Sequence, residues 1–254
     1  MRNRVRLTVL VLVGCACLIG AAIAFASETF TITSYFTPDK LGAPTNLSAS
    51  AVFATDGGVP TPVGHVLAYG PAGLGVDVSG AGTCQKAMLE QNGPSGCPAD
   101  SRIGFGGGRG LVEIAKEFIK EPYTLDFFLA PKENGHLAFL IYAQGTSPVS
   151  LELVILAKEV HGPKPYGLGV EFEVPPIPTL PGAAYASIET NYLTIGSQKV
   201  AYYHTVHGKQ KLVHVKGLIV PKTCPKGGFP FKVTISYLDG SSSTDTYTAP
   251  CPGK

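Results

Sequence analysis

The residue types that most often carry chemistry are thinly spread along this chain of 254 residues. The densest group is His204, His207 and His214, and the first two have the spacing of a metal-binding pair on a helix. This segment alternates like a strand, however, so side chains three positions apart face opposite sides. No glutamate follows His204, as a zinc protease would require. We therefore predict solvent-exposed strand histidines and no metal site.

Two other patterns bear on catalysis. Glu171 and Glu173 are two residues apart and would share one strand face, which is compatible with a glycosidase carboxylate pair. The chain has no tryptophan to form a sugar-binding platform, so a solvated strand face explains the pair more simply. There is also no Gly-x-Ser-x-Gly elbow for a serine nucleophile. We predict no catalytic residues, with a secreted hydrolase as the alternative.

A glycine-rich run covers residues 104–110, with the sequence Gly-Phe-Gly-Gly-Gly-Arg-Gly. It has neither the Gly-x-Gly-x-x-Gly spacing of a dinucleotide site nor the Gly-Lys-Ser/Thr ending of a phosphate loop. We predict a glycine turn that connects two strands, and no cofactor.

The cysteines predict structural cross-links. Outside the N-terminal apolar segment the chain has four of them, Cys84, Cys97, Cys224 and Cys251, and four cysteines allow three pairings. The absence of a Cys-x-x-Cys spacing argues against a zinc site or a redox-active pair. The spacing favours local pairs, because Cys84 and Cys97 bracket a short helical turn. Cys224 and Cys251 bracket a hairpin with a two-residue turn at residues 239–240.

The N-terminus has the pattern of a signal peptide. Three arginines within the first six residues precede the uncharged residues 7–26, which end in Ala-Phe-Ala. We expect cleavage between Ala26 and Ser27, which gives a signal peptide over residues 1–26. An uncleaved membrane anchor and lipidation at Cys15 are the alternatives. All three place the rest of the chain outside the cytoplasm.

The composition favours short strands over long helices. Only 15% of residues are charged, which argues against a disordered polyelectrolyte, and the 31 glycines and 21 prolines favour many turns. A helix or a strand fits residues 111–121, and the context favours a strand. The proline-rich residues 174–181 are expected to form an edge crossover or an extended linker. Two-residue alternation predicts strands over residues 30–36, 46–53, 123–129, 137–143, 149–157, 168–174, 185–195 and 212–220, and in a final hairpin over 229–248.

Strands at this spacing indicate an antiparallel sandwich or barrel. We predict an all-β fold of antiparallel β-sandwiches, Ig-like in general architecture, with one short helical turn between Cys84 and Cys97. The expected organisation is an N-terminal β region over residues 27–118 and a C-terminal β-sandwich region over residues 119–254, or one continuous domain.

Charge is divided unevenly along the chain. No acidic residue lies between Thr190 and Leu238, although seven lysines do. Such asymmetry suggests a surface for anionic envelope polymers or lipid headgroups, with Lys209, Lys211 and Lys216 as the candidate anion-binding residues. The simpler explanation is edge lysines that prevent sheet aggregation, or attraction between the two halves. Export and the scarcity of arginine after the signal segment argue against nucleic acid.

Three motifs resemble those of a known group of proteins. They are Thr83-Cys84, the stretch from Cys97 to Gly106 that reads Cys-Pro-Ala-Asp-Ser-Arg-Ile-Gly-Phe-Gly, and a late segment over residues 218–231 followed by a terminal Pro-Cys-Pro. The chain resembles uncharacterised secreted β-rich actinobacterial proteins with these motifs. The resemblance implies export, a β-sandwich-like fold and paired cysteines, and it implies no activity or functional residue.

The sequence therefore predicts an exported cell-envelope or extracellular structural or binding protein without catalytic activity. A carrier of an apolar small molecule is a further alternative, which a large apolar cavity would favour. The ligand, the partner and the oligomeric state are left open by the sequence.

Overall fold

The computed structural model of the chain describes residues 28–55, 58–197 and 201–252. The predicted signal peptide, its cleavage site at Ala26 and Ser27, and the alternative lipidation site at Cys15 lie outside these residues. Within the described ranges, no helix has the length and apolar character needed to cross a membrane.

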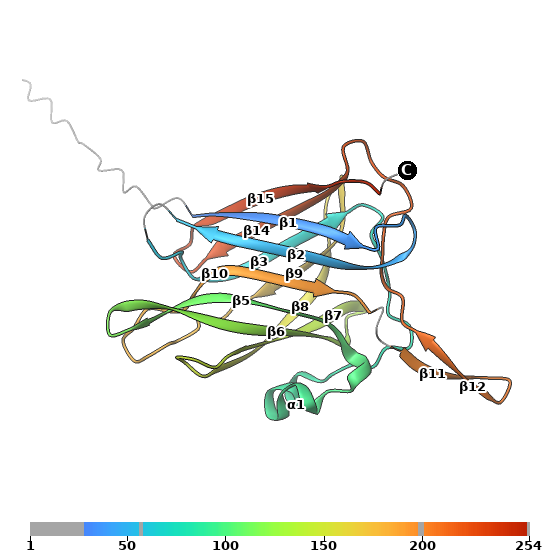
Figure 1. Cartoon of the computed structure of the whole chain (residues 1–254), viewed down its shortest axis with the longest axis horizontal. Helices are drawn as coiled ribbons and strands as arrows, with labels where there is room; N and C mark the ends of the chain where they lie inside the picture. The colour runs from blue at the N-terminus through green and yellow to red at the C-terminus, as the bar shows by residue number, and fades with distance from the viewer. Residues whose placement is uncertain (1–27, 56–57, 198–200, 253–254) are drawn as a thin grey trace, which may run out of the picture.

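The described chain is mostly antiparallel β-structure, as predicted (Figure 1). Its single α-helix among the described residues, α1 (Lys86–Asn92), lies between Cys84 and Cys97, also as predicted. The strands are β1 (Thr29–Thr37), β2 (Pro44–Ala54), β3 (Val63–Pro71), β4 (Gly75–Asp77), β5 (Arg102–Ile114), β6 (Glu117–Glu133), β7 (His136–Gly145), β8 (Leu151–His161), β9 (Tyr166–Glu173), β10 (Ser187–Ile195), β11 (Ala201–Val206), β12 (Lys209–His214), β13 (Gly217–Ile219), β14 (Phe229–Tyr237) and β15 (Ser242–Ala249).

Thirteen of these strands form one antiparallel sheet in the order β15-β14-β3-β9-β8-β7-β6-β5-β10-β2-β13-β4, with β1 also paired to β2. The sheet rolls up, so that β1, which is paired with β2, also contacts β15 at the opposite end of the strand order. At this contact the backbone N–H of Ile32 donates a 2.8 Å hydrogen bond to Asp245 Oδ2. The predicted Ig-like sandwich is therefore not confirmed, since one rolled sheet forms both sides of the core. Strands β11 and β12 form a separate hairpin that extends away from the roll (Figure 1).

Alternation of apolar residues accounts for most of the strands. In β1 every second residue is buried, from Phe30 through Ile32 and Ser34 to Phe36, as the sequence predicted. The ambiguous residues 111–121 are extended, but they span the turn between β5 and β6. The predicted strand over 212–220 is divided between β12 and β13. The predicted boundary at 118/119 falls within β6, and strands from both sides of it pair in the one sheet.

The glycine turn predicted at residues 104–110 is wrong, because the whole run lies within β5, between β6 and β10. A side chain at Gly108 would overlap the backbone oxygen of Thr190 and the ring hydroxyl of Tyr123. The glycines therefore allow β10 and the Tyr123 ring to approach β5 closely.

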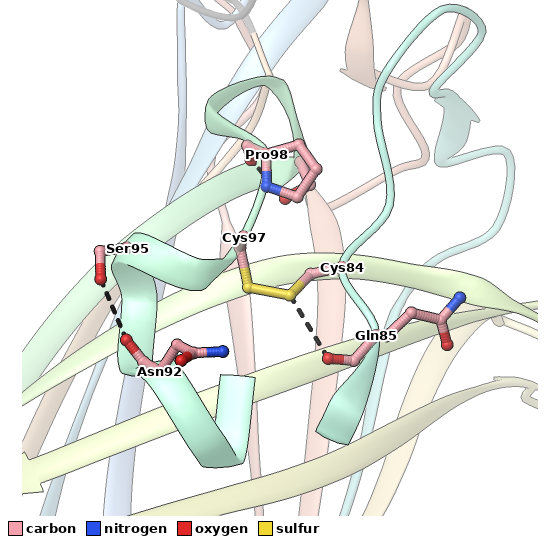
Figure 2. Close-up of a disulfide and its surroundings, with 7 residues drawn as sticks. Cys84, Gln85, Asn92, Ser95, Cys97 and Pro98 are labelled. Carbon is pink, nitrogen blue, oxygen red and sulfur yellow. Dashed lines mark hydrogen bonds between the residues drawn. A yellow bond between two sulfur atoms is a disulfide. The ribbon is translucent and has the colours of Figure 1, made fainter. Parts of the chain in front are cut away.

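Both predicted disulfides are present, with Cα–Cα distances of 5.1 Å for Cys84–Cys97 and 5.9 Å for Cys224–Cys251. The first closes the segment that contains α1 (Figure 2), which covers the outer face of β6, β7 and β8. There Leu89 packs in a small outer cluster, made up of Cys84, Leu89, Phe128, Ala130, Ala138, Leu140 and Tyr142.

The second disulfide closes the β14–β15 hairpin, whose turn differs from the prediction. Ser236 pairs with Ser242, and the Tyr237 N–H donates to the Ser241 carbonyl. The loop therefore has three residues, 238–240, in place of two. Gly240, at φ 86°, adopts the left-handed conformation that this loop requires.

Candidate functional site

The inside of the roll contains a cavity of about 410 Å³. This volume lies within the range of about 300–1,000 Å³ that is typical of small-molecule sites. Nearly all of the wall is apolar and comes from alternate residues of strands all around the roll. Representative wall residues are Phe30, Leu47, Phe53, Leu125, Phe172 and Ile235.

The start of β6 contributes a charged group to this wall. Glu121 lines the cavity and is only 5% exposed. Its Oε2 accepts a 3.3 Å hydrogen bond from the backbone N–H of Val149, in the loop between β7 and β8. Its Oε1 is buried without a hydrogen-bond partner among the described residues. Burial raises the pKa of Glu121, and the backbone amides of Val149 and Ser147 partly oppose this shift.

Tyr123, the next inward residue of β6, is by contrast satisfied. Its hydroxyl lies 3.0 Å from the backbone oxygen of Thr190 and 3.0 Å from Asn191 Oδ1, both on β10. Burial raises the pKa of this hydroxyl, so it remains neutral. Tyr123 and Asn191 also line the cavity, so polar groups of β6 and β10 form one section of an otherwise apolar wall.

The carboxylate pair that suggested a glycosidase lies outside the cavity. Glu171 and Glu173 are exposed on β9, and His65 Nε2 lies 3.0 Å from Glu171 Oε1 and 4.0 Å from Glu173 Oε1. This arrangement agrees with the predicted solvated strand face. It places the pair away from the apolar wall, which contains neither residue.

The predicted histidine segment forms the β11–β12 hairpin. His207 lies in its turn, at φ 50°, and His204 and His214 lie on separate strands. No group of three or more potential metal-ligating side chains occurs within the ranges that the structure describes.

The three candidate anion-binding lysines are not equivalent. Lys209 and Lys211 are exposed on β12 and share a strand face. Lys216 instead pairs with Asp77 of β4, with 3.0 Å between Nζ and Oδ2. Its hydrogen bond lowers the pKa of Asp77, and Ser79 adds to this effect. Binding of an anionic polymer or lipid surface by these lysines stays a prediction.

Comparisons of the chain with protein-family models, with curated protein sequences and with solved structures gave no match. The two disulfides indicate an extracytoplasmic protein, because the cytoplasm keeps most thiols reduced.

Glu121 was not among the candidate residues predicted from the sequence. The signal was its position in the alternation of β6, where Glu121 and Tyr123 precede Leu125 and Phe127 on the inward face. A carboxylate on the inward, apolar face of a strand is unusual, because burial without a partner makes the ionised form unfavourable. Both a helix and a strand fit residues 111–121, and the next predicted strand begins only at Tyr123, so this alternation was not recognised at Glu121.

Proposed function

We propose that this protein binds an elongated apolar molecule inside the rolled sheet and acts as its carrier outside the cytoplasm. The apolar cavity of about 410 Å³ is the observation that carries the proposal. Protein interiors are ordinarily close-packed, with few voids larger than a water molecule. An apolar space of this size is therefore better explained as a binding site than as a packing defect.

The wall supports binding over catalysis. A hydrolase needs a nucleophile or a pair of acid–base groups next to the substrate. Glu121 has no histidine, cysteine or second carboxylate beside it in the described wall. We therefore propose that the protein is a carrier and not an enzyme.

Export is the second part of the proposal. We propose that residues 1–26 direct the chain across the membrane, that cleavage falls between Ala26 and Ser27, and that the mature protein is secreted or associated with the cell envelope. The disulfides support this location. Intact-mass analysis of the protein from its host tests it, since a start at Ser27 is expected and a retained Met1 would contradict it.

Two neighbouring residues of β2 test the cavity. Ala51 lines it, whereas Val52 is exposed on the outer face. Ala51→Phe should fill part of the space and weaken binding of Nile red at least tenfold, and Val52→Phe should leave it unchanged. Both variants are checked for folding by circular dichroism and thermal unfolding. A folded wild-type chain that binds no dye, or equal binding by both variants, would contradict the carrier proposal.

A further inference from the structure

We infer that the bound molecule has an N–H or O–H donor at its head, and that Glu121 Oε1 accepts the hydrogen bond from it. The inference rests on the proposed carrier function and names the class of its ligand. The ligand class is an apolar chain or ring system that ends in an alcohol or a protonated amine.

The position of Glu121 is the first support. It is the only charged side chain in the described wall of the cavity, and it is almost completely buried. Gly145 of β7 packs against it, and any side chain at Gly145 would overlap Oε1. The absence of a side chain at Gly145, which also lines the cavity, makes room for the carboxyl group there.

The second support is the unequal use of the two carboxyl oxygens. Oε2 accepts from the backbone N–H of Val149 at 3.3 Å and so holds the β7–β8 loop. Oε1 has no partner among the described residues although it is buried. A buried acceptor without a donor destabilises the fold. If Glu121 served only to hold the loop, one oxygen would be sufficient.

The nearest polar side chain of the same strand face is already engaged. The Tyr123 hydroxyl interacts with the Thr190 backbone oxygen and Asn191 Oδ1, at 3.0 Å each. Among the fully buried side-chain atoms that the structure describes, Glu121 Oε1 is the acceptor of the cavity wall that has no partner. At a pH where Glu121 is ionised, a ketone or ester head would place lone pairs against lone pairs, and a fatty-acid anion would add charge repulsion. An alcohol or an ammonium head avoids both.

The Glu121→Gln variant gives a sharp test, because it reverses the hydrogen-bonding character of this position. The backbone amide of Val149 requires an acceptor, so the glutamine carbonyl oxygen should take the place of Oε2. The glutamine NH₂ group then takes the place of Oε1 and presents donors to the cavity. Glu117→Gln is the matched control, because Glu117 is exposed at the start of the same strand.

The experiment measures the affinities of 1-dodecanol, 1-dodecylamine and 2-dodecanone by displacement of Nile red from the purified chain. The three probes have equal numbers of non-hydrogen atoms and differ at the head. Wild type and Glu117→Gln should bind the alcohol or the amine about tenfold more tightly than the ketone, as expected for a hydrogen bond to a charged group. Glu121→Gln should prefer the ketone. A preference of wild type for the amine over the alcohol identifies an ammonium head, and the reverse identifies a hydroxyl.

Three results would overturn the inference, and the third is distinguishable from the first two. If all three probes bind wild type equally, or if Glu121→Gln leaves a donor preference intact, the head-group assignment is wrong while the carrier proposal stands. If no probe and no dye binds the folded wild-type chain, the carrier proposal fails as well. The rank order in wild type remains a test even if Glu121→Gln does not fold.

Discussion

The sheet has two apolar faces at β6, β7 and β8, and they are packed in different ways. On the outer face, α1 and the disulfide Cys84–Cys97 cover a small cluster in which Leu89 and Leu140 are 0% exposed. On the inner face, a much larger set of apolar side chains surrounds open space. The outer face is therefore close-packed under the α1 segment, whereas the inner face of the same strands borders a cavity.

Two matched truncations test this difference, and one of them should give the largest loss of stability. Leu140→Ala removes a side chain from the close-packed outer cluster and should lower the free energy of unfolding by about 3–5 kcal/mol. Leu153→Ala removes a side chain that already borders the cavity, so it has fewer contacts to lose. We expect a loss of about 1–2 kcal/mol there. Denaturant unfolding measures both, and equal losses would contradict the contrast between the two faces.

Removal of the outer cross-link should separate stability from binding. The double variant Cys84→Ser/Cys97→Ser is expected to lose about 3 kcal/mol, because the disulfide closes a loop of 13 residues. Nile red affinity at a temperature where the variant is folded should stay within about twofold, which is less than 0.5 kcal/mol. A large drop in affinity would show that the outer cluster shapes the cavity.

The pH dependence of stability is expected to change at Glu121. Burial raises the pKa of Glu121 in the folded chain, so its ionisation opposes folding. The penalty is absent below the pKa of an unfolded-chain glutamate, about 4.3, and develops as the pH rises through the folded pKa. Glu121→Gln should therefore be more stable than wild type at pH 8 by about 1 kcal/mol, a typical hydrogen-bond-sized effect.

That gain should disappear near pH 3, well below the unfolded-chain pKa of about 4.3, where the wild-type carboxyl is protonated in both states. Thermal unfolding of both proteins across this range measures it. A difference that does not vary with pH would show that the pKa of Glu121 is the same in the folded and the unfolded chain.

The smallest effect is expected at the Asp77–Lys216 pair, outside both packed faces. The folded pKa of Asp77 is lowered, so its contribution to stability is present above about pH 4 and is lost as the pH falls through the folded value. Because Lys216 is well exposed, Asp77→Asn should cost less than about 1 kcal/mol at pH 7. A loss comparable to that of Leu140→Ala in the same unfolding assay would show a structural role for this surface pair.

Much of the secondary structure followed from local patterns. The alternation in β1 and the spacing of the four cysteines were sufficient to predict the strand and both disulfides. Strand β3 was missed because Val63–Pro71 contains two glycines and no clear alternation of polar residues. The prediction of a turn at residues 104–110 was wrong, because glycine favours turns on local grounds. The glycines are needed for a long-range contact, the close approach of Thr190 to Gly108, which the local sequence does not indicate.

The candidate site was harder to predict than the strands. Residues on nearly every strand line the cavity, so it exists only once distant segments have paired. The histidines and the Glu171–Glu173 pair were singled out for their spacing, and neither lies in the cavity wall. Glu121 has no motif around it, and its role follows from burial that the sequence does not report directly.

The seam between β1 and β15 joins segments that lie far apart in the sequence, since Ile32 and Asp245 are separated by 213 positions. The nascent polypeptide therefore cannot enclose a guest until β15 has been synthesised. Contacts of such long range also slow folding. Loading of the ligand is consequently expected to follow the synthesis and docking of β15, the strand that closes the roll against β1.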